Sequence, residues 1–123
     1  MNWVSKKLWL ASIAIFAGST EATAAKSDDS PVVARAKAGP CQMTISGGTS
    51  SFLAVVTGLA PNEPLKLTSN SEGEIIRWDG NAQEDGRFGV VLIPLVIGKS
   101  FGTARFELVG QRCRIEASYP WRE

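Results

Sequence analysis

Apolar and polar residues alternate along Phe101–Trp121, in two runs joined at Val109-Gly110-Gln111. The alternation assigns one set of side chains to a common core: Ala104, Phe106, Leu108, Cys113, Ile115, Ala117 and Tyr119. The positions between them are charged and are expected to face water: Arg105, Glu107, Arg112, Arg114 and Glu116. A period of two is typical of half-buried strands, so this stretch predicts an antiparallel pair at the end of the chain.

Five more short apolar segments precede this pair, and each is bounded by turn residues: Gln42–Ser46, Ser51–Thr57, Leu65–Ser69, Glu74–Asp79 and Phe88–Leu95. Pro94 has no backbone N–H, so its strand must end there, bulge there or lie on a sheet edge. No segment after the first 25 residues sustains a helical stripe. Evenly spaced short strands with Gly and Pro turns predict an all-β protein, a single seven-stranded antiparallel sandwich over residues 40–123.

The N-terminal 25 residues have the layout of a secretory signal peptide. Lys6 and Lys7 precede the apolar run Leu8–Ala17, and small residues follow at Ala22–Ala25. The run has about half of the roughly 20 apolar residues that a membrane span needs. We therefore expect cleavage after residue 25, a periplasmic or secreted protein, and no membrane insertion of the mature chain. Lys26–Gly39 is expected to form a flexible leader, with a short edge strand at Val32-Val33 as the alternative.

Cys41 and Cys113 are the two cysteines of the chain, and they do not form a CxxC motif. An even pair in an exported small domain predicts a disulfide, with free or redox-active thiols as the alternative. The formal net charge of +1 arises from the signal region, because Lys6 and Lys7 outnumber Glu21 there. A neutral mature chain lacks the basic surface that binds nucleic acid or an anionic membrane, so neither is expected as a principal partner.

Three motifs point to a known fold family. Val56–Glu63 reads VTGLAPNE, Asp85–Phe88 reads DGRF, and Gly98–Phe106 reads GKSFGTARF. Together they resemble bacterial immunoglobulin-like and fibronectin-III-like domains, in which a GL-P-E turn precedes an exposed strand and a DG-F turn opens a core strand. The resemblance covers Cys41–Trp121 and implies a β-sandwich, but it carries over no binding or catalytic residue.

The cysteine positions differ from those of antibody domains. Antibody cysteines lie on strands that face each other across the sheets, with a Tyr two residues before the second one. Here Cys41 opens the first predicted strand, Cys113 lies in the last one, and Gln111 occupies the Tyr position. The resemblance therefore implies a sandwich whose terminal strands are tied together.

Catalytic chemistry has few candidates, because the chain contains no histidine. This excludes triads with a His base and most catalytic zinc sites. The closest carboxylate pairs are Glu72/Glu74 and Glu84/Asp85, which lie in or beside predicted turns, where solvated carboxylates are expected. Calcium binding by Asp79–Asp85 is an alternative, but its spacing does not match an EF-hand loop. We expect no enzymatic activity and no cofactor.

The remaining hypothesis is an exported binding or structural module of the cell envelope. Its expected partner is another envelope or extracellular protein, with a glycan or a second copy as alternatives. The candidate contact surface comprises Arg112, Arg114 and Trp121, although the arginines also suit a row that discourages edge pairing and Trp121 also suits a core plug. The alternative function is a hydrolase inhibitor that presents the loop Gly80–Arg87 to an active site.

Overall fold

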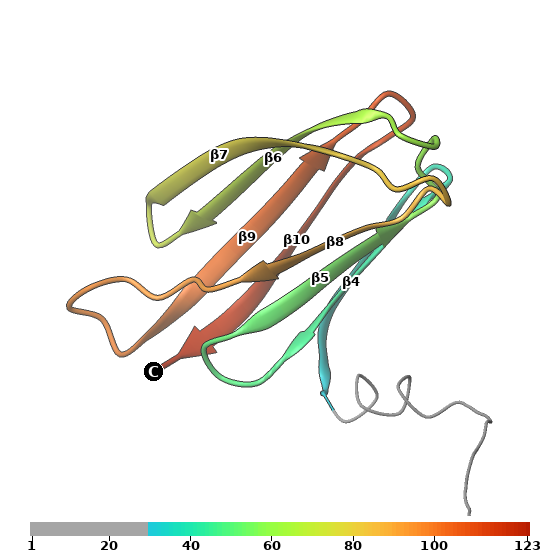
Figure 1. The fold of residues 1–123 in the computed structure, drawn as a ribbon. Coiled ribbons are helices and arrows are strands. Elements are labelled where there is room, and N and C mark those ends of the chain that lie inside the picture. Colours follow the sequence, from blue (N-terminus) through green and yellow to red (C-terminus); the bar gives the residue numbers. More distant parts are fainter. Residues whose placement is uncertain (1–29) are drawn as a thin grey trace, which may run out of the picture. The chain divides into compact units, whose positions relative to one another are not determined.

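The computed structural model describes residues 30–123, and Val32–Glu123 form one compact unit (Figure 1). The predicted signal peptide lies outside the described residues. The unit contains eight strands: β3 (Val32–Ala38), β4 (Cys41–Gly47), β5 (Phe52–Thr57), β6 (Pro64–Ser71), β7 (Glu74–Asn81), β8 (Phe88–Leu92), β9 (Phe101–Val109) and β10 (Arg114–Arg122). Within residues 30–123, no helix is long and apolar enough to cross a membrane.

The strands form two four-stranded antiparallel sheets, one in the order β10-β9-β6-β7 and the other in the order β3-β4-β5-β8. Strand β5 pairs with β8, as strand B pairs with E in immunoglobulin domains. Strand β9 lies between β6 and β10, as F lies between C and G, and β7 is an added strand beside β6. The fold is therefore an immunoglobulin-like β-sandwich, as the sequence predicted. Strand β10 lies against β3 and β4, so the edges β7 and β8 lie on the other side of the sandwich.

The predicted hairpin at the end of the chain is confirmed. Strand β9 pairs with β10 in a register that sets Phe106 opposite Ala117. All the predicted core side chains of the two strands are buried except Cys113, which is half-buried in the turn before β10 rather than within the strand. The buried residues of both sheets form one core: Cys41, Met43, Ile45, Phe52, Ala54, Val56, Leu59, Leu65, Leu67, Ala82, Leu92, Ala104, Phe106, Leu108, Ile115, Ala117, Tyr119 and Trp121.

The expected flexible leader is wrong for half of its length, because Val32–Ala38 form β3 and raise the strand count from seven to eight. Ala34 and Ala36 are partly buried against the core, whereas Arg35 and Lys37 face water. The sequence thus has the period of a strand here. Alanine hides this pattern because its side chain buries little apolar surface.

The Cys41–Cys113 disulfide is present, with the two Cα atoms 6.3 Å apart and 72 positions apart in sequence. It joins the start of β4 in one sheet to the turn that precedes β10 in the other. In the chain-entropy account, closing a loop of this length stabilises the fold by about 4 kcal/mol.

A buried carboxylate lies in the turn between β5 and β6. Glu63 is only 3% exposed, and its Oε1 accepts a hydrogen bond from the Ala60 N–H at 2.6 Å. Its Oε2 accepts one from the N–H of Gln111, in the turn between β9 and β10. The Glu of the GL-P-E motif therefore closes its own turn and also connects it to the turn that carries Cys113.

Candidate protein-interaction surface

A row of exposed aliphatic side chains runs along β8 and continues into the segment after it. Val91 is 61% exposed, Ile93 is 66% exposed, Leu95 is also exposed, and Ile97 is fully exposed. Leu53 on β5 lies opposite Val91 in the register and is exposed on the same face. We call this set, Leu53, Val91, Ile93, Leu95 and Ile97, the apolar strip.

The apolar strip lies on a sheet edge that lacks charge. The eleven residues of Phe88–Gly98 include no charged side chain. The other three edges of the described sheets carry several: Arg35 and Lys37 on β3, Glu74, Arg77 and Asp79 on β7, and Arg114, Glu116 and Arg122 on β10. Charged residues on edge strands prevent pairing with other chains. The edge at β8 has no such protection.

The hydrogen-bond pattern shows which backbone groups of β8 are free. The Gly48 N–H donates to the Ser51 carbonyl (3.2 Å) and so continues the β4–β5 register one pair beyond Gly47 and Phe52. Because bonded and non-bonded pairs alternate, the even-numbered residues of β5 direct their N–H and C=O groups at β8. They pair with the even-numbered residues of β8. The odd-numbered residues of β8 therefore direct their N–H and C=O groups at the free edge.

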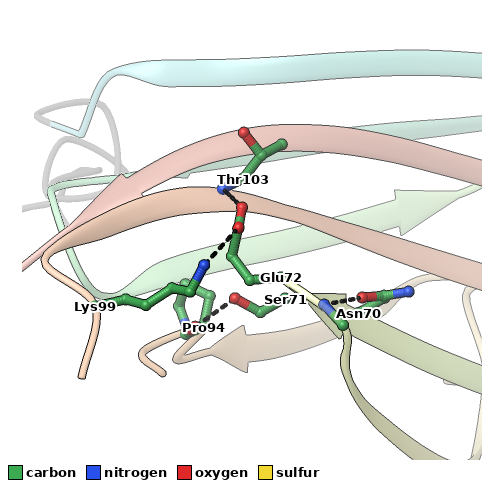
Figure 2. A network of polar contacts seen from close by, with 7 residues as sticks. Asn70, Ser71, Glu72, Pro94, Lys99 and Thr103 are labelled. Atoms are coloured by element: carbon green, nitrogen blue, oxygen red, sulfur yellow. Dashed lines mark hydrogen bonds and ion pairs between the residues drawn. The ribbon is translucent and has the colours of Figure 1, made fainter. Parts of the chain in front are cut away.

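The segment after β8 is attached to the turn between β6 and β7 (Figure 2). Ser71, which is buried, donates a hydrogen bond from its Oγ to the Pro94 carbonyl at 2.6 Å. Glu72 accepts hydrogen bonds from Lys99 Nζ at 3.3 Å and from the Thr103 N–H at 2.7 Å. The polar contacts thus attach both ends of the stretch that carries Leu95 and Ile97 to the turn between β6 and β7.

The charge and backbone conformation of Glu72 suit its contacts with Lys99 and Thr103. The Thr103 N–H, and next the Lys99 ammonium, hold the pKa of its carboxyl below the ordinary value of 4.5. Its backbone has φ of +51°, a left-handed conformation, and the next residue, Gly73, donates its N–H to Asn70 Oδ1. The side chain lies over Gly102, where a Cβ atom would approach Glu72 Cγ to 2.7 Å.

A shallow depression of about 660 Å³ adjoins the attached segment. Its lining includes Glu72, Lys99, Phe101 and Trp121. Phe101 is 75% exposed and begins β9, so it adds an aromatic side chain close to the end of the apolar strip.

The predicted contact residues do not form one surface. Trp121 is 3% exposed, so it plugs the core and is not a contact residue. Arg114 is exposed and bonded to Glu107 at 2.8 Å, and Arg112 is exposed in the turn before β10. Seven positions of extended strand, about 23 Å, separate Arg114 from Trp121. The two arginines lie at the start of β10 and in the turn before it, and they do not form a patch with Trp121.

The loop Gly80–Arg87 is bound to the turn that contains Glu63. The Ala82 N–H donates to the Glu63 carbonyl, the Leu59 N–H to the Gly86 carbonyl, and the Asn62 N–H to the Gln83 carbonyl. Ala82 is buried, and the exposed residues are Asn81, Gln83–Asp85 and Arg87. In residues 30–123, no group of three or more His, Cys, Asp or Glu side chains is arranged to hold a metal ion.

Sequence reasoning missed the apolar strip, although a signal for it existed. Phe88–Gly98 is apolar at both odd and even positions, whereas the middle of each hairpin strand alternates between apolar and polar residues. An uncharged run with two apolar faces normally indicates a central strand. Pro94 indicated instead that this strand could lie on an edge, where one of those faces is exposed.

Comparison with known proteins finds no sequence match and a similar fold. No family model matches the sequence, and no curated protein matches it. Among solved structures, the chain is similar to a DUF3244 family protein with an immunoglobulin-like β-sandwich fold from Bacteroides vulgatus. The two share 10% identity with a TM-score of 0.44, over 76% of this chain and 99% of that one. The fold assignment therefore rests on the strand order and register of this chain itself.

Proposed function

We propose that this protein is an exported, non-enzymatic binding or structural module of the cell envelope, and that it binds a protein through the apolar strip. The observation that carries the proposal is an uncharged free edge at β8 with exposed Val91, Ile93, Leu95 and Ile97. Large exposed aliphatic groups on a monomer typically mark interaction sites. Free backbone groups on the same edge allow a partner to add a strand.

The attachment of the apolar strip to the turn between β6 and β7 favours a binding surface over a loop that has no function. Ser71 and Glu72 fix the segment that follows β8, so little conformational entropy would be lost when a partner docks. The aliphatic character of the strip favours a protein over a glycan, because protein interfaces have apolar centres.

An exported location and a non-enzymatic role are also parts of the proposal. The N-terminal pattern and the Cys41–Cys113 disulfide suit an oxidising compartment, the periplasm or the exterior. Of the carboxylates considered for catalysis, Glu72 is already engaged by Thr103 and Lys99.

The test is capture from envelope extract with the exported protein as bait. Val91→Lys places a charge in the strip, and Ile76→Lys, at a position that is 64% exposed on the β7 edge, is the matched control. We expect a defined protein to be retained by the wild type and the control and lost with Val91→Lys. Equal capture by all three proteins would show that the strip is not the binding surface.

A further inference from the structure

We propose that the strand added to β8 is β8 of a second copy, in an antiparallel pair across a two-fold axis. This inference rests on the proposed function, since both use the apolar strip as the contact surface. It identifies the partner as a copy of this chain. The dimer would contain a continuous eight-stranded sheet built from two β3-β4-β5-β8 sheets.

The first argument is chemical. A strand that pairs with β8 must be uncharged, and apolar at the positions that lie beside the strip. Among the described strands, β8 has these properties, whereas β3, β7 and β10 carry charged side chains. Two-fold contacts are self-complementary and are the commonest form of oligomer.

The second argument is the register, which follows from parity. The odd-numbered residues direct their backbone groups at the free edge, so they must pair with odd-numbered residues of the other copy. With Leu92 at the two-fold axis, Val91 lies opposite Ile93 of the second copy, and Gly89 lies opposite Leu95.

Neighbouring registers are worse. A shift of two residues in one direction sets Arg87 opposite Leu95, and a charge against an aliphatic side chain destabilises a strand pair. A shift in the other direction sets Gly89 opposite Ile97, which lies in the turn Val96–Lys99 and cannot continue the ladder.

The third argument is steric. A Cβ atom built at Gly89 meets nothing closer than the Ala54 carbonyl oxygen, at 3.9 Å. The space above Gly89 is therefore open to the Leu95 side chain of the second copy. Pro94 does not interfere, because it is even-numbered: its missing N–H and its carbonyl, which accepts from Ser71, belong to the side that faces its own molecule.

Sedimentation of the exported protein over a wide concentration range tests the inference. We expect a monomer–dimer equilibrium in the wild type and in Ile76→Lys, and a monomer in Val91→Lys with an unchanged circular dichroism spectrum. A wild-type protein that stays monomeric throughout would overturn the inference, as would a dimer that survives Val91→Lys.

Disulfide trapping tests the register. The native cysteines are joined to each other, so an added cysteine supplies the free thiol. After mild oxidation, a mixture of Val91→Cys and Ile93→Cys chains should give the mixed dimer in preference to either self-crosslinked dimer. Dominant self-crosslinking of either variant would contradict the Leu92-centred register.

The two proposals fail in different ways. A wild-type monomer that captures an envelope protein through Val91 would refute the second copy and leave the binding module intact. A dimer dispersed by Val91→Lys, with no other protein captured, would support the second copy and make the module a self-associating one.

Discussion

Replacement of Glu63 should destabilise the fold through two backbone donors at once. In Glu63→Gln one end of the side chain becomes an NH₂ group, so either the Ala60 N–H or the Gln111 N–H loses its acceptor. A buried unsatisfied donor costs about 1–3 kcal/mol, and bonds to a charged acceptor lie toward the upper end. Glu63→Ala leaves both donors unpaired and should cost about 2–5 kcal/mol.

Urea unfolding monitored by tryptophan fluorescence measures these losses, with Glu84→Gln as the exposed control expected within about 0.5 kcal/mol of the wild type. Hydrogen exchange gives a local readout, because the Gln111 amide should lose protection in Glu63→Ala before the central strands do. Unfolding free energies for Glu63→Gln and wild type that agree within error would refute the account of Glu63 as a connection between two turns.

Four further predictions concern other parts of the unit. Tyr119 is the single tyrosine, and burial raises its pKa to about 12, so ultraviolet absorbance should show its ionisation well above pH 10. The stability that the neutral phenol contributes should be complete below pH 10.0 and should decline as the pH rises toward 12. Because its hydroxyl has no partner within the described residues, Tyr119→Phe should be neutral or stabilising by up to about 1 kcal/mol, and a larger loss would disprove this. The lowered pKa of Glu72 means that its contribution holds above pH 4.5 and is lost as the pH falls through the lower folded-state pKa. The protection factor of the Thr103 amide, corrected for the intrinsic exchange rate, should therefore fall in acid, and should change less with pH in Glu72→Gln, which lacks this titration. Reduction of Cys41–Cys113 should lower the unfolding free energy by about 4 kcal/mol, and an unchanged urea midpoint would contradict the loop-closure account.

The sequence predicted those elements whose signal is local. The β9–β10 hairpin followed from Phe106 and Ala117 on one face and Arg105 and Glu116 on the other, a pattern that needs no knowledge of distant strands. Strand β3 was missed because alanine gives a weak apolar signal, and only its pairing with β4 reveals the strand.

The candidate surface was harder to predict, because exposure depends on neighbours far away in the chain. Val91 is exposed because its side chain points to the outer face of the sheet, as that of Leu53 does, and because the sheet order leaves β8 without a second neighbour. The role of Glu63 likewise depends on Gln111, 48 positions later. Local patterns state which residues can be buried, and long-range pairing decides which of them are.

The disulfide has a mechanical consequence for the folded unit. Tension applied outside the two cysteines passes from β3 to β10 through the Cys41–Cys113 bond and bypasses the residues between them. Under load, β3 and β10 can peel away from their neighbours, but the strands from β4 to β9 cannot be drawn out while the bond is intact. The strip at β8 would therefore keep its shape under a pull that has already detached the ends of the domain.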